Sequence, residues 1–553
     1  MLVSFNLVDR EWIPCVTPTG EMAHKSILAA LESAGQIQEI RDESPLVTVS
    51  LHRLLLAILH RVFGPESPAE WGDLWNNGSG RFDAPKLRAY LRSSKIHPRF
   101  DLFDANHPFY QVANLPIGEL DKKNMGRPKL VKPIWRMAHE LACSDTMNRS
   151  GHLSETDWDI RPAAEVARWL VAFQAFALGG LITTEEGKKA QDGSADAGHL
   201  VKSAVVLAKG KNLFQTLMLN LVRYSEDDGV PFNFEASRDK PAWEHDEPVR
   251  PADRPFDGYL DLLTWQSRRV KLIAAMGPNG ELFGVSGVVA MKGWQLPGFE
   301  RAGRETMVGF VKPEKVLPGH DPWPPLGFRA GKELWRDCHA LFQSVAEGTQ
   351  RPQVLSWIND LRGRFGLLDW KEVQIVVAGM CVDRAKIYFW RHESLPLPLA
   401  YLDEEEPIGG LKKALTLAAE VGKALRAASW ATVATRLAGD AGMRPDKDRV
   451  GNLLNSFAPE SLYWSRLEIP FRTLLNTLAE AGTPERRSVQ IQNWFYDALH
   501  RTAVVAFANT VGRPNAGRDL KAVTAGSGVL WSLLRKVQRT NNILDRDKKE
   551  GAA

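Results

Sequence analysis

The sequence predicts an α+β protein, in which a large mixed α/β domain is followed by a C-terminal four-helix bundle. Two observations lead to this prediction. Before about residue 400, helical stretches alternate with short β-prone runs that Pro, Gly and Trp interrupt. Beyond residue 409, apolar residues recur almost only at helical spacing. We therefore expect the mixed domain over residues 1–400 and the bundle over residues 401–553.

Helices and strands should alternate in the first domain. Helices are expected over residues 46–63, 163–178 and 213–223. The first of them has a candidate N-cap in Ser50 and a C-terminal stop in Gly64. Between residues 232 and 325, Pro, Gly and Trp residues interrupt short β-prone runs, including 270–273 and 285–291. This pattern predicts short strands and long loops.

The bundle prediction rests on four apolar stripes with helical spacing. They begin at Leu411, Phe471, Ile491 and Val529. Four amphipathic helices in succession can bury their apolar faces against one another, which is typical of a four-helix bundle.

Composition permits a nucleic-acid partner without requiring one. The 70 Lys and Arg residues exceed the 66 Asp and Glu residues by only 4 charges. The cysteines Cys15, Cys143, Cys338 and Cys381 are far apart and form no CxxC pair, which predicts a reduced cytoplasmic location and no structural zinc. No run of about eighteen apolar residues occurs, so we expect no transmembrane helix and no membrane partner.

No catalytic motif is recognisable. Residues 327–333 fail the P-loop spacing, residues 284–287 lack the spacing of a nucleophile elbow, and no HExxH occurs. This favours a binding protein. Two alternatives stay open: a nuclease whose acidic residues are dispersed along the chain, and a helical scaffold indifferent to DNA.

Short basic segments give modest support to contacts with a nucleic-acid backbone. They lie at residues 127–132, 187–189, 268–271 and 535–539. Each of them also fits a solvated protein face.

Three strings together resemble the CasA family of type I-E CRISPR systems. They are FNLVDREWIP at residues 5–14, HPFYQV at 107–112 and GKNLFQTLMLNL at 210–221. The likeness extends over nearly the whole chain. It implies the non-catalytic large subunit of the Cascade surveillance complex, which needs no cofactor. Its implied roles are to recognise a protospacer-adjacent motif in double-stranded DNA, to promote R-loop formation by the guide RNA, and to recruit a helicase-nuclease.

The resemblance also implies which residues meet the motif. Gly179 and Gly180 match a glycine loop that approaches the DNA backbone, although a helix C-cap explains the same glycines. Lys292 matches a lysine that enters the minor groove. Asp383, Arg384 and Ala385 match a hairpin wedge, and they depart from the family's Asn-Gln-Ala pattern.

A further loop of the family contacts the 5′ handle of the guide RNA and the other Cascade subunits. Met147, Asn148 and Arg149 occupy its place here. Some relatives carry a cysteine-rich insertion, but the corresponding residues 275–280 contain no cysteine, so no metal is expected.

Overall fold

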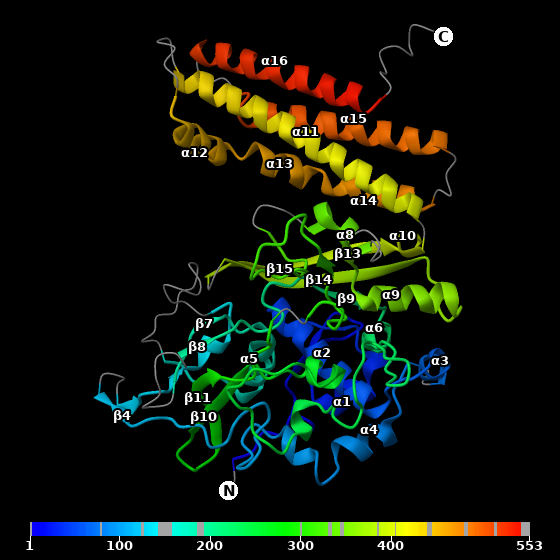
Figure 1. Cartoon of the computed structure of the whole chain (residues 1–553). Coiled ribbons are helices and arrows are strands. Elements are labelled where there is room, and N and C mark those ends of the chain that lie inside the picture. The colour runs from blue at the N-terminus through cyan, green and yellow to red at the C-terminus, as the bar shows by residue number, and fades with distance from the viewer. Residues whose placement is uncertain are drawn as a thin grey trace. The chain divides into compact units, whose positions relative to one another are not determined.

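The chain folds into two compact units, Met1–Leu397 and Pro398–Ala553 (Figure 1). The computed structural model describes residues 3–77, 80–122, 126–141, 158–184, 193–298, 301–329, 334–342, 348–383, 386–403, 405–438, 445–480, 485–513 and 517–543. Helices and strands mix in the first unit, whereas the described elements of the second unit are almost entirely helical. The prediction of mixed helix and strand content is therefore confirmed.

Helix α2 (Pro45–Val62) is the buried centre of the first unit. It begins at the N-cap Ser44, whose Oγ accepts from the Val47 amide, and Pro45 provides the first-turn geometry. The prediction that Ser50 is the N-cap is wrong, because its Oγ donates to the Leu46 carbonyl inside the helix at 2.8 Å. By length and composition α2 could cross a membrane, yet 78% of it is buried inside the fold.

An ion pair lies inside this core. The Arg53 guanidinium of α2 donates to both carboxylate oxygens of Glu305, at 2.7 and 3.0 Å. The two side chains are 1% and 3% exposed. Because a buried charge is costly unless it is paired, each residue depends on the other.

Helix α5 (Ala163–Phe176) packs against α2. It is shorter than predicted, because its C-cap Ala177 already has extended backbone angles. The remaining helices of the first unit are short: α1 (Ile27–Glu32), α3 (Pro68–Asn77), α4 (Ala84–Leu91), α6 (Leu213–Asn220), α7 (Tyr259–Leu263), α8 (His339–Phe342) and α9 (Gln353–Asn359).

The strands form several small sheets around these helices. One has the order β2-β1-β3, from Met22–Lys25, Ile13–Val16 and Glu39–Ile40. A second has the order β15-β14-β9, from Lys386–Pro398, Glu372–Asp383 and Val205–Lys209. Two-stranded sheets pair β4 (Leu120–Asp121) with β5 (Arg127–Pro128), β7 (Gly180–Leu181) with β8 (Ser194–Ala195), and β12 (Phe310–Val311) with β13 (Thr349–Gln350).

The sheet β10-β11-β6 carries one of the candidate site residues. Strands β10 (Arg268–Met276) and β11 (Leu282–Lys292) form an antiparallel hairpin, and β6 (Lys132–Pro133) pairs with the outer side of β11. The predicted β-prone runs 270–273 and 285–291 lie within these two strands. Val289 and Met291 of β11 are buried in an apolar cluster with Leu115, Leu130 and Val131. This packing fixes which residues of β11 face inward.

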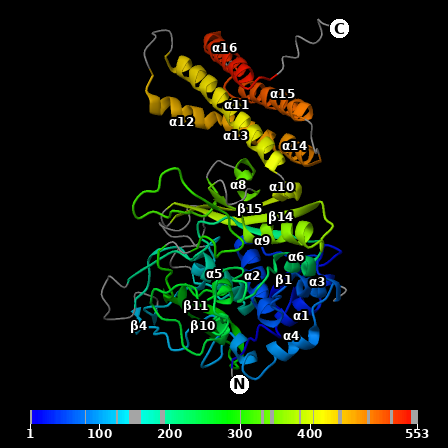
Figure 2. The same cartoon turned by 45° about the vertical axis from the view of Figure 1, so that its right-hand side comes forward.

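The second unit is built around the long helix α11 (Glu405–Ala438). It contacts each of the other helices: α10 (Ala400–Asp403), α12 (Lys447–Phe457), α13 (Pro459–Arg466), α14 (Glu468–Glu480), α15 (Glu485–Asn509) and α16 (Gly517–Thr540). Helices α15 and α16 run along α11 in both views (Figures 1 and 2).

The four apolar stripes of the sequence fall in α11, α14, α15 and α16, and the sequence analysis missed α12 and α13. The chain breaks between these two at Ala458, which has φ +48, so no continuous stripe marks them. Their buried residues include Leu454, Tyr463 and Trp464. The four-helix arrangement of this unit stays a prediction.

Candidate nucleic-acid interface

The two candidate glycines lie beyond α5, at the start of a small exposed hairpin. Gly180 pairs with Ala195 and Leu181 pairs with Ser194. Gly180 has φ +126, a backbone conformation that L-residues rarely adopt, and a Cβ on Gly179 would lie 2.8 Å from the Ala197 nitrogen. The helix C-cap is Ala177. The C-cap interpretation of these glycines is therefore wrong.

Lys292 is the last residue of β11. Its neighbour Met291 is fully buried in the apolar cluster, and successive side chains of a strand point to opposite faces, so Lys292 faces away from that cluster. Among the described residues, its ammonium group forms no ion pair. Lys292 is half-buried, and its side chain lies on the same face of the sheet as that of its cross-strand partner Arg268.

Arg268 connects the lysine strand with the glycine hairpin. Its backbone pairs with Lys292 across β10 and β11. Its Nη2 donates to the main-chain carbonyls of Leu178 and Asp196, at 2.8 and 2.7 Å. These carbonyls lie just before β7 and just after β8, so one guanidinium holds both ends of the hairpin.

Two buried glutamines complete this connection. Gln174 of α5 accepts from the Arg268 amide at 2.9 Å and donates to the Arg268 carbonyl at 3.0 Å. Gln295 donates to the Trp294 carbonyl at 2.8 Å and accepts from the Asp196 amide. Gln174 therefore joins α5 to the start of β10, and Gln295 joins the segment after β11 to the β7–β8 hairpin.

The role of Arg268 was not predicted, because residues 268–271 resemble an exposed basic segment in the sequence. Arg268 is 2% exposed. The usable signal was the two-residue period of the strand: Arg268, Val270 and Leu272 share one face, and all three are buried. No comparable signal marks Gln174 or Gln295.

The proposed wedge lies in another sheet. Strand β14 ends at Asp383, and its neighbour β15 begins at Lys386, which agrees with the predicted hairpin. Arg384 and Ala385 lie outside the described residues, as do Met147, Asn148 and Arg149. Arg268 thus links the hairpin that begins near Gly179 and Gly180 to the strand that ends at Lys292, whereas Asp383 lies in a separate sheet.

A cavity of about 420 Å³ adjoins the end of β14. Met380 and Val382 of β14 line it, together with three prolines and Phe328. Of its described lining residues, Lys202 and Arg329 are basic and none is acidic. This composition would tolerate a phosphate group nearby.

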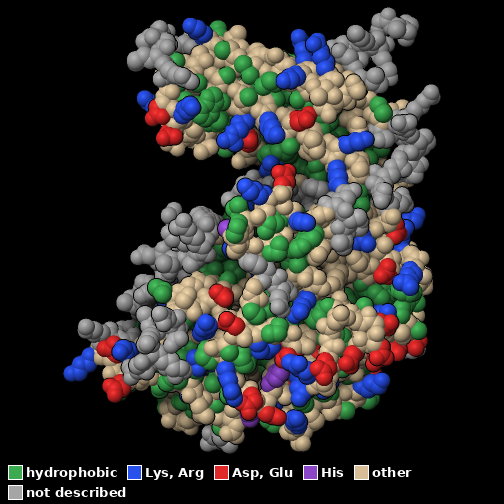
Figure 3. Space-filling model, viewed as in Figure 1, with side chains coloured by type: hydrophobic (Ala, Val, Ile, Leu, Met, Phe, Trp, Pro, Cys, Tyr) green, Lys and Arg blue, Asp and Glu red, His purple; other side chains and the backbone are tan. Residues whose placement is uncertain are grey.

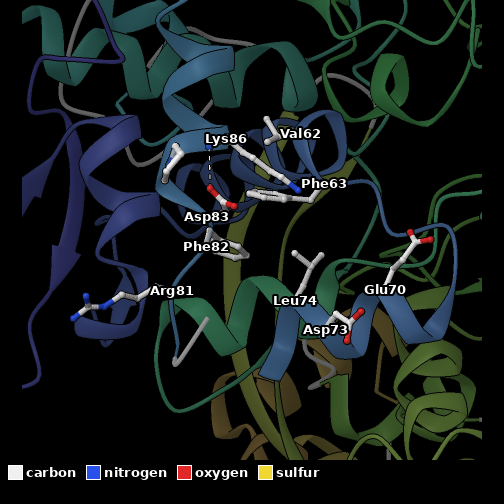
Figure 4. A pocket seen from close by; sticks show the side chains of 10 residues that line it. Val62, Phe63, Glu70, Asp73, Leu74, Arg81, Phe82, Asp83 and Lys86 are labelled. Carbon is white, nitrogen blue, oxygen red and sulfur yellow. Dashed lines mark hydrogen bonds between the residues drawn. The ribbon is translucent and has the colours of Figure 1, made fainter. Parts of the chain in front are cut away.

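A larger cavity of about 720 Å³ lies elsewhere, next to α3 and α4 (Figure 4). Phe63 and Phe82 stack beside it, with ring centroids 5.9 Å apart. Its rim mixes acidic and basic residues, and its Asp83 carboxylate caps α4 by accepting from the Lys86 amide at 3.0 Å. The mixed charge does not favour a polyanion at this cavity.

The visible surface carries interspersed charge rather than one strongly basic face (Figure 3). This distribution agrees with the small net charge of +4. Within the described part of the chain, no group of three or more His, Cys, Asp or Glu residues is placed to hold a metal ion.

Comparison with known proteins defines the class to which this fold belongs, the CRISPR-associated proteins. The family model of the CRISPR-associated protein Cse1 matches residues 6–505. CasA/Cse1 of Thermus thermophilus is 30% identical over 549 residues, which cover 96% of this chain and 98% of that protein. The chain therefore belongs to the Cse1 family, also named CasA.

Solved structures agree in fold over nearly the full length. The crystal structure of Thermus thermophilus CasA matches with a TM-score of 0.75 at 27% identity, covering 96% of this chain and 99% of that chain. Thermobifida fusca Cse1 matches with a TM-score of 0.77 at 24% identity, covering 98% and 99%. A chain of a CRISPR RNA-guided surveillance complex matches with a TM-score of 0.71 at 19% identity, covering 96% and 100%.

Proposed function

We propose that this chain is the large, non-catalytic subunit of a type I-E Cascade complex in the cytoplasm. In that role it recognises a protospacer-adjacent motif in double-stranded DNA and promotes R-loop formation by the guide RNA. It also contacts the 5′ handle of the guide RNA and the other Cascade subunits, and it recruits the helicase-nuclease. Residues 1–400 would carry the motif site, and residues 401–553 would form a four-helix bundle.

The observation that carries this proposal is the joined glycine hairpin and lysine strand in a chain of the Cse1 family. A glycine turn without side chains permits close approach of a DNA backbone. Lys292 supplies a cation, which suits the acceptors of the minor groove and its negative potential. The degenerate pattern of that groove predicts tolerance of several motifs.

The hairpin of β14 and β15 is the proposed wedge that separates the first base pair beside the motif. Asp383, Arg384 and Ala385 would occupy its tip. Arginine can stack on an unpaired base or bind a phosphate, whereas aspartate is repelled by phosphates. Asp383 therefore favours a role in bracing Arg384 over contact with the DNA backbone.

The proposal is tested by reconstitution. Guide-loaded Cascade subunits are assembled with and without this chain, and binding of a matched target duplex is measured at fixed salt across a library of flanking trinucleotides. We expect motif-dependent binding only when the chain is present. Binding that is indifferent to the chain contradicts the proposal.

Catalysis is tested separately with the chain alone. Labelled DNA is incubated with the protein and Mg²⁺ or Mn²⁺, and no cleavage is expected. Cleavage that disappears on substitution of one acidic residue would instead support the nuclease alternative.

A further inference from the structure

We propose that Arg268 is a positioning residue, which holds the β7–β8 hairpin and Lys292 in one fixed geometry so that both meet the same stretch of DNA. The inference rests on the proposed function, because it names the residue that makes the two parts of the motif site act together.

Both ends of the hairpin depend on the Arg268 side chain. Its Nη2 reaches the Leu178 carbonyl before β7 and the Asp196 carbonyl after β8, at 2.8 and 2.7 Å. Its Nη1 donates to the Ser267 carbonyl at 2.9 Å. Without the guanidinium, these carbonyls would lose a charge-assisted donor.

The Arg268 backbone sets the place of the lysine. Arg268 lies opposite Lys292 in the β10–β11 register. The Gln174 side chain from α5 bonds both the amide and the carbonyl of Arg268. Arg268 therefore connects the β10–β11 strand pair to α5 through its backbone, and it bonds the hairpin carbonyls through its side chain.

Arg268 is a buried cation, and among the described residues no carboxylate lies within ion-pair distance of its guanidinium. Burial lowers its pKa to about 10, although the charge of the nearby Asp196 carboxylate acts in the opposite direction. It therefore stays charged at neutral pH, and the main-chain carbonyls are its acceptors. Moving the hairpin away would leave a buried charge with fewer acceptors, which is costly.

A matched control lies in the second unit. Arg436 of α11 also donates from Nη2 to two main-chain carbonyls, those of Val511 and Arg513, both at 2.8 Å. Arg436→Met removes the same kind of carbonyl contacts, together with an ion pair to Asp519 at 3.4 Å, without touching the candidate site.

The experiment compares wild type, Arg268→Met, Arg268→Lys and Arg436→Met in two measurements. The first is amide hydrogen exchange of the full chain without DNA. We expect faster exchange in Arg268→Met at the β7–β8 amides, including that of Ile182, which donates to the Gly193 carbonyl at 2.8 Å. The β10–β11 amides and all amides of the second unit should keep their wild-type rates.

The second measurement is motif discrimination by the assembled complex, taken as the ratio of dissociation constants for wrong and preferred motifs. This ratio does not depend on the fraction of folded protein. We expect Arg268→Met to lower it about tenfold, or about 1.4 kcal/mol, Arg268→Lys to recover part of it, and Arg436→Met to leave it unchanged.

The outcomes separate the inference from the proposed function. An unchanged ratio in Arg268→Met, or unchanged exchange in the hairpin, overturns the role of Arg268 while motif recognition by the wild type stands. A wild-type complex without motif discrimination overturns the proposed function and the inference with it. If Arg268→Met does not fold, Arg268→Lys carries both measurements, and wild-type values in it overturn the inference.

Discussion

The ion pair of Arg53 and Glu305 offers a quantitative test of how a buried charge pair stabilises the first unit. Both side chains are nearly inaccessible, with exposed fractions of 1% and 3%. The guanidinium contacts both carboxylate oxygens, at 2.7 and 3.0 Å, and it also lies 3.2 Å from the His199 ring. Arg53→Met removes these contacts at similar side-chain volume.

The expected loss of free energy of unfolding follows from the contacts that Glu305 keeps after the substitution. After Arg53→Met, the buried Glu305 carboxylate keeps the Met307 amide as a donor, at 3.2 Å. Removing one partner of a buried pair costs about 3–5 kcal/mol, because the other charge stays buried without compensation. The double variant Arg53→Met/Glu305→Leu removes both charges. It should lose less free energy of unfolding than Arg53→Met alone.

The assay is urea unfolding, read through amide exchange of α2 so that the two units are not confused. Arg88→Met is the matched control, because Arg88 contacts both oxygens of Glu32, at 2.6 and 3.0 Å, on the surface. Exposed pairs contribute little to stability. Equal losses of free energy of unfolding in Arg53→Met and Arg88→Met would refute the reasoning. A double variant that is less stable than Arg53→Met would refute it as well.

The remaining predictions concern pH, the second unit and the hairpin. Burial lowers the pKa of His52 and of His139 to about 4, whereas the unfolded chain titrates near 6.5. The unfolded state therefore binds more protons below about pH 6.5, so the free energy of unfolding should fall as pH decreases from about 6.5 to 4. His139→Gln should make this decline shallower in acid unfolding, and an unchanged slope would contradict the assignment. In the second unit, the buried Tyr463 hydroxyl donates to the Ala418 carbonyl at 2.9 Å. Tyr463→Phe should lower the stability of that unit by about 1 kcal/mol in chemical denaturation, and a wild-type value would show that the contact is unimportant. Leu181 is 95% exposed on β7, so Leu181→Glu should weaken DNA binding by the complex about tenfold through repulsion of phosphates. Leu120→Glu on β4 is the control for a general charge effect, and equal weakening by both variants would remove the hairpin from the site.

Local patterns predicted helix α2, parts of strands β10 and β11, and the helices α11, α14, α15 and α16, because their apolar spacing is specified by one stretch of chain. They did not mark the long strands β14 and β15 or the helices α12 and α13. Residues within the strings that carry the family resemblance also have structural roles. In residues 210–221, Asn212 caps α6, and Asn220 bonds both the amide and the carbonyl of Ala208 in β9.

The connections within the site could not be predicted, because they join residues far apart in the chain. Arg268 reaches carbonyls 90 and 72 residues away. Gln174 and Gln295 have no sequence pattern that distinguishes them from exposed glutamines. In contrast, Gly179, Gly180 and Lys292 were chosen through the family resemblance, and their contribution to DNA binding stays a prediction.

Motif recognition by Lys292 is tested most directly by a single comparison. Guide-loaded complexes containing wild type, Lys292→Ala or Lys271→Ala are titrated with duplexes that carry preferred or wrong motifs, at several salt concentrations. Lys271 is a lysine of the same hairpin, on β10. We predict that Lys292→Ala loses motif discrimination, while Lys271→Ala retains it. Equal discrimination by all three complexes would contradict the assignment of Lys292 to the motif.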